Sequence, residues 1–579
     1  MIDRRRYAAE RRKRRNAYDV LGDGIVREYS TASAQIDTFA AVSYFYTPTG
    51  FAGGPDVATE TTHVLRFWNN KSAVTDAVIF AYCDATSGWF FDVKGTTYSL
   101  SLRSSSSTTI ATDYGEKDGV NVMVFTITAG GDVKHSLNGG PVKTTVAPTR
   151  VNGSSSAKLY IGRAPPTIGT FACANVAFLA YSRLGRVATD AELVAWSRTD
   201  TVDLYHQHAD VLAAPTLDFH ATAEGWDGSS SSWAFARGSI TLTKEGTPAK
   251  TTLEAETVYT IPGSMFHDAR KSTDVYDRGS FARVVFDTAA TSRLQWTFRD
   301  TGSVWTREFA VLENGTFKAA KTVSGSGIVG GNPRFVSSPV ALTAGSKRIT
   351  LVEGCRDQGG TGPYYGDGVT TAKLRAPTSQ PITLVAPTRP STRLLVVGDS
   401  ISVGIKATVP ETDAWPVLIR GIAPAGWGVT SDGWNASSIY DRTMQAAWRA
   451  ASIARWSALL DGTDTNILWF ALGTNDWGIG LWAGDTTAYS AHWGTVFDDL
   501  MAARPDVTII AQTPILAVAD TTPSPQQPWR EAIVTAASAR SIRYVRGELW
   551  TDIAMADNLH PTTAGYATYA GHVRTELSI

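Results

Sequence analysis

The sequence predicts a multidomain protein in which two all-β sandwiches precede a three-layer α/β domain. The middle layer of that domain is a parallel sheet. Its 579 residues are too many for one hydrophobic core, and 43% hydrophobic with 18% charged residues is a globular composition. Short β-branched and aromatic runs, separated by turns rich in glycine and serine, fill most of the chain up to residue 390. After that point, apolar strands alternate with amphipathic helices, which is typical of a parallel sheet covered on both faces.

Residues 1–28 are expected to form a basic arm. Residues 4–15 contain seven arginines and one lysine, and no apolar stripe follows that a helix could bury. The arm is either a solvated tail or a docking segment for a larger assembly, a membrane surface or a nucleic acid. The net charge of -1 argues against general nucleic-acid binding by the whole chain. A homo-oligomer or a virion is the kind of assembly that the arm could join.

Residues 29–204 are expected to form the first sandwich. Its clearest strand signals are 122–127, 158–162 and 176–181. Thr189–Glu192 is a capping box that opens one short helix, with Leu193 and Trp196 on its inward face. Many short strands closed by one small helix resemble the laminin-G/concanavalin-like lectin sandwich.

Residues 205–390 are expected to form a second sandwich of jelly-roll type, with a proline-rich linker at 377–390. Its strand signals are 239–243, 281–286 and 347–352. Sandwiches of both kinds often hold sugars on aromatic side chains. The tryptophans at 68, 89, 226 and 233 are nevertheless expected in cores or as loop anchors, and Tyr364–Tyr365 is treated in the same way.

The metal-binding and thiol side chains give weaker signals. His206 and His208 lie one residue apart, but no acidic or thiol ligand is grouped with them, so linker surface is expected instead of a metal site. Three cysteines exclude a disulfide scaffold. Cys83 and Cys173 lie in one expected domain, where they either pair or remain buried thiols. No apolar run is long enough to span a membrane, and no secretion signal is visible.

Three motifs in residues 391–579 carry the chemistry. Leu394–Ser400 is an apolar strand that breaks at Gly-Asp-Ser, and Phe470–Asp476 repeats the design with Gly-Thr-Asn-Asp. Asp557–His560 has the spacing Asp-x-x-His, in which one turn of chain lets a carboxylate reach an imidazole. Serine is a weak nucleophile until a base takes its proton and a third group orients that base, so these residue types together point to acyl transfer.

These blocks resemble the SGNH, or GDSL-type, hydrolase family, whose domain has a flavodoxin-like fold. The resemblance covers about residues 392–579. It implies that Ser400 is the nucleophile, His560 the base and Asp557 its orienting partner. The middle β domain also loosely resembles the one that precedes the catalytic domain in some carbohydrate esterases of this clan.

The resemblance also implies an oxyanion hole. Its donors would be the backbone N–H groups of Ser400 and Gly433 and the side-chain amide of Asn475. A shifted register would put Ala436 in the place of Gly433, because the second sequence block matches less cleanly.

The function expected is a serine esterase that needs no metal or cofactor. Two sandwiches before the catalytic domain suggest an acetylated polysaccharide or cell-surface glycan as the partner, without nucleic acid or membrane. An extracellular or virion-associated location, such as a phage tail, is expected. The alternatives are a lipolytic or thioester hydrolase with the same triad, and a glycan-binding adhesion protein with a vestigial site.

Overall fold

The computed structural model describes most of the chain between residues 18 and 579. Gaps of five or more residues lie at 1–17, 21–25, 38–43, 48–59, 70–76, 146–156, 163–175, 199–205, 298–304, 324–335, 358–370 and 517–523, and shorter gaps interrupt other loops. Most of the basic arm, Tyr364–Tyr365, Cys173 and Cys355 lie outside the described residues, as does the side chain of Cys83. Among the described helices, none is long and apolar enough to cross a membrane.

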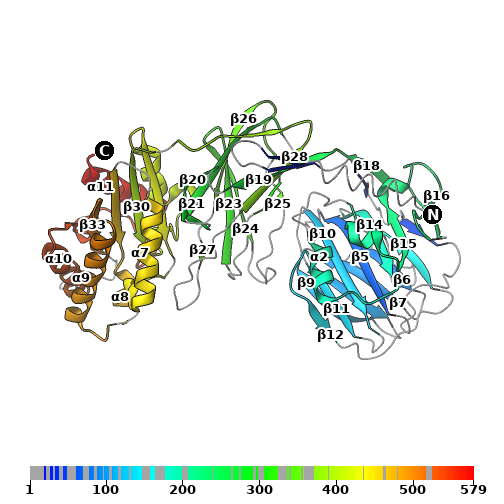
Figure 1. Cartoon of the computed structure of the whole chain (residues 1–579), viewed down its shortest axis with the longest axis horizontal. Coiled ribbons are helices and arrows are strands. Elements are labelled where there is room, and N and C mark those ends of the chain that lie inside the picture. The colour runs from blue at the N-terminus through cyan, green and yellow to red at the C-terminus, as the bar shows by residue number, and fades with distance from the viewer. Residues whose placement is uncertain are drawn as a thin grey trace.

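The N-terminal sandwich consists of two antiparallel sheets of eight strands each (Figure 1). The first sheet runs in the order β12 (Lys143–Thr145), β11 (Val133–Leu137), β10 (Gly119–Ile127), β5 (Thr61–Asn69), β14 (Val176–Leu184), β3 (Ser33–Asp37) and β18 (Ala249–Leu253), and β15 (Leu217–Thr222) also pairs with β14. The second runs in the order β16 (Ser232–Ala234), β17 (Thr241–Glu245), β4 (Tyr44–Tyr46), β13 (Lys158–Ile161), β6 (Ala77–Cys83), β7 (Gly88–Lys94), β8 (Thr97–Arg103) and β9 (Ser107–Tyr114).

Aromatic side chains from both sheets form the core of this sandwich. Phe67 and Phe125 of the first sheet pack in one cluster with Phe80 and Phe91 of the second. The tryptophans at 89, 226 and 233 are buried in the same cluster, as expected from the sequence. They are therefore core residues and not a sugar platform.

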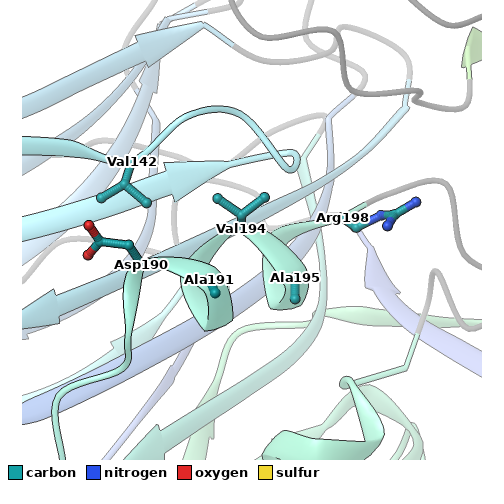
Figure 2. A pocket seen from close by; sticks show the side chains of 6 residues that line it. All are labelled: Val142, Asp190, Ala191, Val194, Ala195 and Arg198. Atoms are coloured by element: carbon teal, nitrogen blue, oxygen red, sulfur yellow. The ribbon is translucent and has the colours of Figure 1, made fainter.

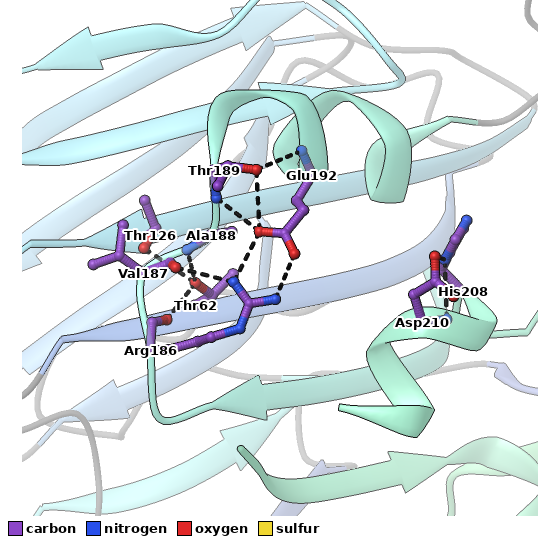
Figure 3. A network of polar contacts seen from close by, with 9 residues as sticks. All are labelled: Thr62, Thr126, Arg186, Val187, Ala188, Thr189, Glu192, His208 and Asp210. Carbon is purple, nitrogen blue, oxygen red and sulfur yellow. Dashed lines mark hydrogen bonds and ion pairs between the residues drawn. The ribbon is translucent and has the colours of Figure 1, made fainter. Parts of the chain in front are cut away.

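Helix α2 (Asp190–Ser197) closes the first sandwich, and its capping box is confirmed. The Thr189 hydroxyl accepts a hydrogen bond from Glu192 N–H, while the Glu192 carboxylate accepts from Thr189 N–H and from Arg186 (Figure 3). Leu193 and Trp196 are buried beneath the helix. This reciprocal capping satisfies two of the backbone donors that a helix N-terminus leaves free.

The other face of α2 is open. Its residues line a hollow of about 620 Å³ together with Val142, which directly precedes β12 (Figure 2). The lining is mainly aliphatic, with the charged side chains of Asp190 and Arg198 at its ends, and it contains no aromatic side chain. Sugars are commonly held on aromatic faces, so this hollow lacks that feature.

The two histidines near the expected linker have structural roles. His206 lies 3.2 Å from the Glu224 carboxylate. The His208 ring accepts a hydrogen bond from Asp210 N–H and so caps α3 (Ala209–Ala213), ahead of the 3₁₀ turn η1 (Ala223–Gly225). His206 thus contacts an acidic side chain, and His208 is a helix cap.

The middle region is a second sandwich. One sheet has the order β1 (Tyr18–Val20), β2 (Val26–Tyr29), β19 (Glu256–Pro262), β28 (Thr371–Pro377), β22 (Gln295–Thr297) and β25 (Val336–Ser337). The facing strands are β24 (Thr316–Val323), β23 (Trp305–Glu313), β26 (Lys347–Glu353) and β21 (Val275–Thr288), with β20 (Phe266–Ser272), β27 (Arg356–Asp357) and β29 (Ile382–Leu384) at their sides. Tyr259, Ile261 and Leu374 of the first sheet pack against Phe286 and Leu351 of the second.

The sheets divide the chain differently from the expected boundaries. Strands β15 to β18 lie in the region 205–390, which was expected to form the second sandwich, but they pair with strands of the N-terminal sandwich. Conversely, β2 lies mostly inside the expected arm but pairs with β19 of the middle sandwich. Pairing between strands far apart in the sequence follows from tertiary packing, and local hydrophobic patterns do not encode it.

The C-terminal domain has the expected parallel sheet, in the order β31 (Trp427–Gly433), β30 (Thr392–Gly398), β32 (Thr465–Ala471), β33 (Val507–Gln512) and β34 (Arg543–Val545). By position in the chain this order is 2-1-3-4-5, the flavodoxin-like arrangement. The helices of the domain are α4 (Pro410–Asp413), α5 (Trp415–Ile422), α6 (Ile439–Thr443), α7 (Ala446–Leu460), α8 (Thr474–Gly478), α9 (Thr486–Ala503), α10 (Gln527–Ser538) and α11 (Thr563–Leu577), with a 3₁₀ turn η3 (Gly547–Leu549).

Strand β30 shows why this domain has three layers. Leu395 and Val397 face one cluster, which contains residues of α7, α9 and α10, while Leu394 and Val396 face a second cluster with residues of α5 and α11. Successive side chains of a strand point to opposite faces, so an unbroken apolar run requires helices on both sides. Helix α9 covers one of these faces, because four of its residues are buried in the first of the two clusters: Trp493, Val496, Phe497 and Leu500.

The middle sandwich is joined to the parallel sheet of the C-terminal domain. Ser280 of β21 pairs with Ser431 of β31, which makes one twelve-stranded sheet from the two domains. Next to this bridge, Phe281 and Val352 form an apolar cluster with Val403 and Ala414 of the C-terminal domain. We call this cluster the domain seam.

Candidate active site

Ser400 lies directly after β30, at the carboxyl edge of the parallel sheet. A glycine is required at position 398, two residues before Ser400, because a Cβ there would clash with the Ser402 hydroxyl oxygen. The turn is fixed by hydrogen bonds from Ile401 N–H to the Asp399 carboxylate (3.0 Å) and from Ile405 N–H to the Ser400 carbonyl (3.1 Å). The nucleophile candidate therefore sits on a tightly constrained loop.

The loop before α11 carries Asp557 and His560. One Asp557 carboxylate oxygen accepts hydrogen bonds from the backbone N–H groups of Leu559 (2.8 Å) and His560 (2.7 Å). Helix α11 is tied to the nucleophile loop by Tyr566, whose hydroxyl donates to the Ile405 carbonyl at 2.8 Å. These contacts fix the position of the His560 loop relative to the Ser400 loop.

The structure brings the three predicted triad residues together. His560 Nε2 lies 3.0 Å from Ser400 Oγ, and His560 Nδ1 lies 3.1 Å from the nearer Asp557 oxygen. Burial opposes the charge of Asp557, but the hydrogen bonds that it accepts outweigh this effect and lower its pKa to about 2. An ionised carboxylate on Nδ1 leaves Nε2 free to take the serine proton.

Two of the predicted oxyanion donors lie at the ends of β31 and β32, the two strands that flank β30. Asn475 is in the first turn of α8, directly after β32, and its side-chain amide donates to the Ser437 carbonyl at 2.8 Å. Gly433 ends β31 in register with Gly398, and a Cβ there would lie 2.9 Å from Val403. Close packing against the nucleophile loop is thus a sufficient reason for this glycine.

Ala436, the alternative position for the second backbone donor, differs from Gly433 in its backbone conformation. Ala436 adopts a left-handed backbone with φ of 56° in the loop after β31. This conformation favours glycine, so an alanine there is strained. Both Gly433 and Ala436 therefore remain candidates for the second backbone donor.

Asp476 is a buried carboxylate to which sequence reasoning gave no role. It accepts hydrogen bonds from Ile439 N–H (2.9 Å), Tyr440 N–H (3.1 Å) and the Trp482 indole N–H (3.1 Å). Burial raises its pKa to about 6 in spite of these bonds. The residue joins the start of α6 to α8 and so holds the loop with Ser437 against Asn475.

Asp399 is also buried, and one of its carboxylate oxygens has no hydrogen-bond partner. Burial raises the pKa of Asp399 from 3.8 to about 7. The folded state therefore binds a proton that the unfolded chain has already lost, and stability falls as pH rises from about 4 to about 7.

Asp399→Asn should remove this pH dependence, because the amide is neutral throughout. We expect the free energy of unfolding of the variant to rise relative to that of the native chain between pH 4 and pH 8, by at most about 4 kcal/mol. Urea titrations at pH 4 and pH 8 measure this. A difference that is the same at both pH values would contradict a raised pKa.

The comparisons with known proteins bear on this domain. Residues 396–568 match the GDSL-like Lipase/Acylhydrolase family, a segment that is less than a third of the chain. The resemblance of the C-terminal domain to SGNH/GDSL-type hydrolases is confirmed by this match. No curated protein matches the chain.

Three similar solved structures have low identity. A family two carbohydrate esterase from Clostridium thermocellum, in complex with cellohexaose, is 13% identical and covers 55% of this chain and 99% of its own, with a TM-score of 0.37. The acetyl xylan esterase Est2A from Butyrivibrio proteoclasticus is 12% identical, with coverage of 55% and 96% and a TM-score of 0.37. The salicylyl-acyltransferase SsfX3 from a tetracycline biosynthetic pathway is 14% identical, again with 55% and 96% coverage and a TM-score of 0.37.

The site geometry and the family match define one class of domain. The C-terminal domain is a GDSL-like acylhydrolase domain, with its motif residues at the carboxyl edge of a parallel sheet. Within the described part of the chain, no group of three or more histidine, cysteine or acidic side chains is arranged to hold a metal ion.

Proposed function

We propose that this chain is a serine esterase that removes O-acetyl groups from a polysaccharide. The observation that carries the proposal is the chain of contacts from Ser400 through His560 to Asp557, with distances of 3.0 and 3.1 Å. A hydroxyl, an imidazole and an ionised carboxylate in this order are the groups that acyl transfer from serine needs.

The mechanism follows from these contacts. His560 takes the proton of Ser400 as its oxygen attacks the ester carbonyl, and the Asn475 amide with backbone N–H groups binds the oxyanion that forms. His560 then gives the proton to the leaving alcohol, and an acyl-serine remains. Water, deprotonated by His560, attacks this intermediate and releases the acid.

The choice of substrate rests on domain architecture. Two β-sandwiches precede the esterase domain, and a module that holds a polymer near an active site raises its local concentration there. The basic N-terminal arm supports attachment to a homo-oligomeric or virion assembly, for example a phage tail protein that acts on host surface glycan. A gene located away from phage structural genes would contradict the virion part of the proposal.

A panel of esters tests the activity and the substrate class. Aryl acetate, butyrate and octanoate should be compared with acetylated xylan and an acetylated bacterial exopolysaccharide, with acid release as the measurement. We expect preference for acetyl groups and release of acetate from at least one polysaccharide. Preference for octanoate would instead assign a lipolytic or thioester hydrolase, and glycan binding without turnover would assign an adhesion protein.

A further inference from the structure

Arg442 of α6 is a buried cation beside the active site, and its side chain is 1% exposed. All three of its guanidinium nitrogens are used. Nη1 donates to the Asp432 carboxylate, Nη2 to the backbone carbonyls of Gly398 and Asp432, and Nε to the Ser437 hydroxyl, each at 2.9 Å. A rigid fork with several fixed donors can hold separate chain segments in one geometry.

The acceptors belong to the segments that carry the site. Gly398 ends the strand before Ser400, and Asp432 precedes Gly433. Ser437 uses its backbone carbonyl to hold the Asn475 amide at 2.8 Å. Arg442 therefore lies at the point where the nucleophile strand and the loop that contacts the oxyanion donor meet.

The surroundings keep the guanidinium in place. Asp432 also accepts hydrogen bonds from Arg455 and from the indole N–H of Trp456, both at 2.9 Å. The ring of Trp434 covers the guanidinium at 4.1 Å. Burial opposes the charge of Asp432, but the two arginine charges outweigh it and lower the pKa of this carboxyl. A buried ion pair costs desolvation, which is offset only when its geometry is well satisfied.

We propose that Arg442 is a positioning residue for the oxyanion side of the site, acting through Ser437 on Asn475. This inference rests on the proposed esterase function and names a residue for that reaction outside the known motifs. The competing explanation is that the Arg442–Asp432 pair only stabilises the fold. The two explanations differ in one respect: whether the loss of kcat caused by a substitution of Arg442 depends on the presence of Asn475.

A double-mutant cycle separates the two explanations. Arg442→Lys keeps the charge, but one ammonium group cannot reach all of the acceptors, so the loop with Ser437 should shift. We expect kcat for aryl acetate to fall about 100-fold while KM changes little, since small displacements in a site have this effect. In an Asn475→Ala background the same substitution should cost less than about threefold, because the group that it positions is gone.

Arg530→Lys is the matched control. Arg530 is also completely buried, and it donates to the backbone carbonyls of Pro514 and Ile515 at 3.1 Å. Its replacement should lower the thermal midpoint without a comparable loss of kcat. If Arg442→Lys does not fold, Ser437→Ala replaces it in the cycle, because it removes one contact of Arg442 and leaves the ion pair in place.

The outcomes are distinct. Losses that multiply in the double variant, or an unchanged kcat in folded Arg442→Lys, would overturn the positioning role and leave the esterase proposal intact. If the native chain shows no ester hydrolysis that Ser400→Ala abolishes, the proposed function is overturned, and the role of Arg442 with it.

Discussion

Ser400→Ala should lower kcat for an aryl acetate by about a million-fold, the scale of loss known for nucleophile removal in serine hydrolases. The described contact of Ser400 Oγ is with His560, so alanine removes the reacting atom and little else. Circular dichroism and the thermal midpoint should be unchanged, and any glycan binding should persist. Acetate release over hours, after subtraction of the uncatalysed hydrolysis of the ester, measures the residual rate.

Ser490→Ala is the control for this prediction. Its hydroxyl donates to the Ala532 carbonyl at 2.9 Å between α9 and α10, so it loses one hydrogen bond in the same domain without touching the triad. The control should retain full activity. Full activity of Ser400→Ala would remove the nucleophile assignment and, with it, the mechanism proposed above.

Asp557→Asn should give the second large loss, about ten-thousand-fold in kcat, the scale found when a triad carboxylate becomes an amide. The amide oxygen can still accept the N–H groups of Leu559 and His560, so the loop should keep its shape. The amide nitrogen, however, would donate toward His560 Nδ1 and favour the tautomer that has its proton on Nε2. That tautomer cannot accept the proton of Ser400.

The same domain offers a matched control for the aspartate. Asp552 and His572 form another acid–imidazole pair, with 2.6 Å between the His572 ring nitrogen and the carboxylate, on exposed parts of the domain. Asp552→Asn should leave kcat unchanged. If Asp557→Asn were equally harmless, His560 would not need a carboxylate partner, and the triad would reduce to a Ser400–His560 dyad.

The sequence alone predicted the fold class and the order of the site motifs, because both depend on local patterns. Leu394–Ser400 reads as a buried strand that ends in a turn, and Asp557–His560 brings its own two side chains together within one turn of chain. Neither inference needs knowledge of which strands pair. The match to the family at residues 396–568 confirms the class of the domain to which they belong.

The boundaries of the β regions and the role of Arg442 could not be predicted in this way. Strand β17 alternates in the sequence as any half-buried strand does, and nothing local shows that its partner is β4, almost two hundred residues earlier. Arg442 lies in a short helix where an arginine usually points to solvent, and only the tertiary structure surrounds it with acceptors. Asp476 was visible within its motif, but its bonds to α6 also depend on long-range packing.

Through the domain seam, the middle sandwich supports the loop that carries Ser400. Val403, three residues after Ser400, is fully buried in a cluster with Phe281 and Val352 from the preceding domain. In a fragment that contains residues 391–579 alone, this valine and Ala414 would face water. The β31 edge would then be free to pair with another chain. The smallest autonomous form of this enzyme is therefore expected to begin before β19, with the β-sandwich retained as scaffold whether or not it ever touches a sugar.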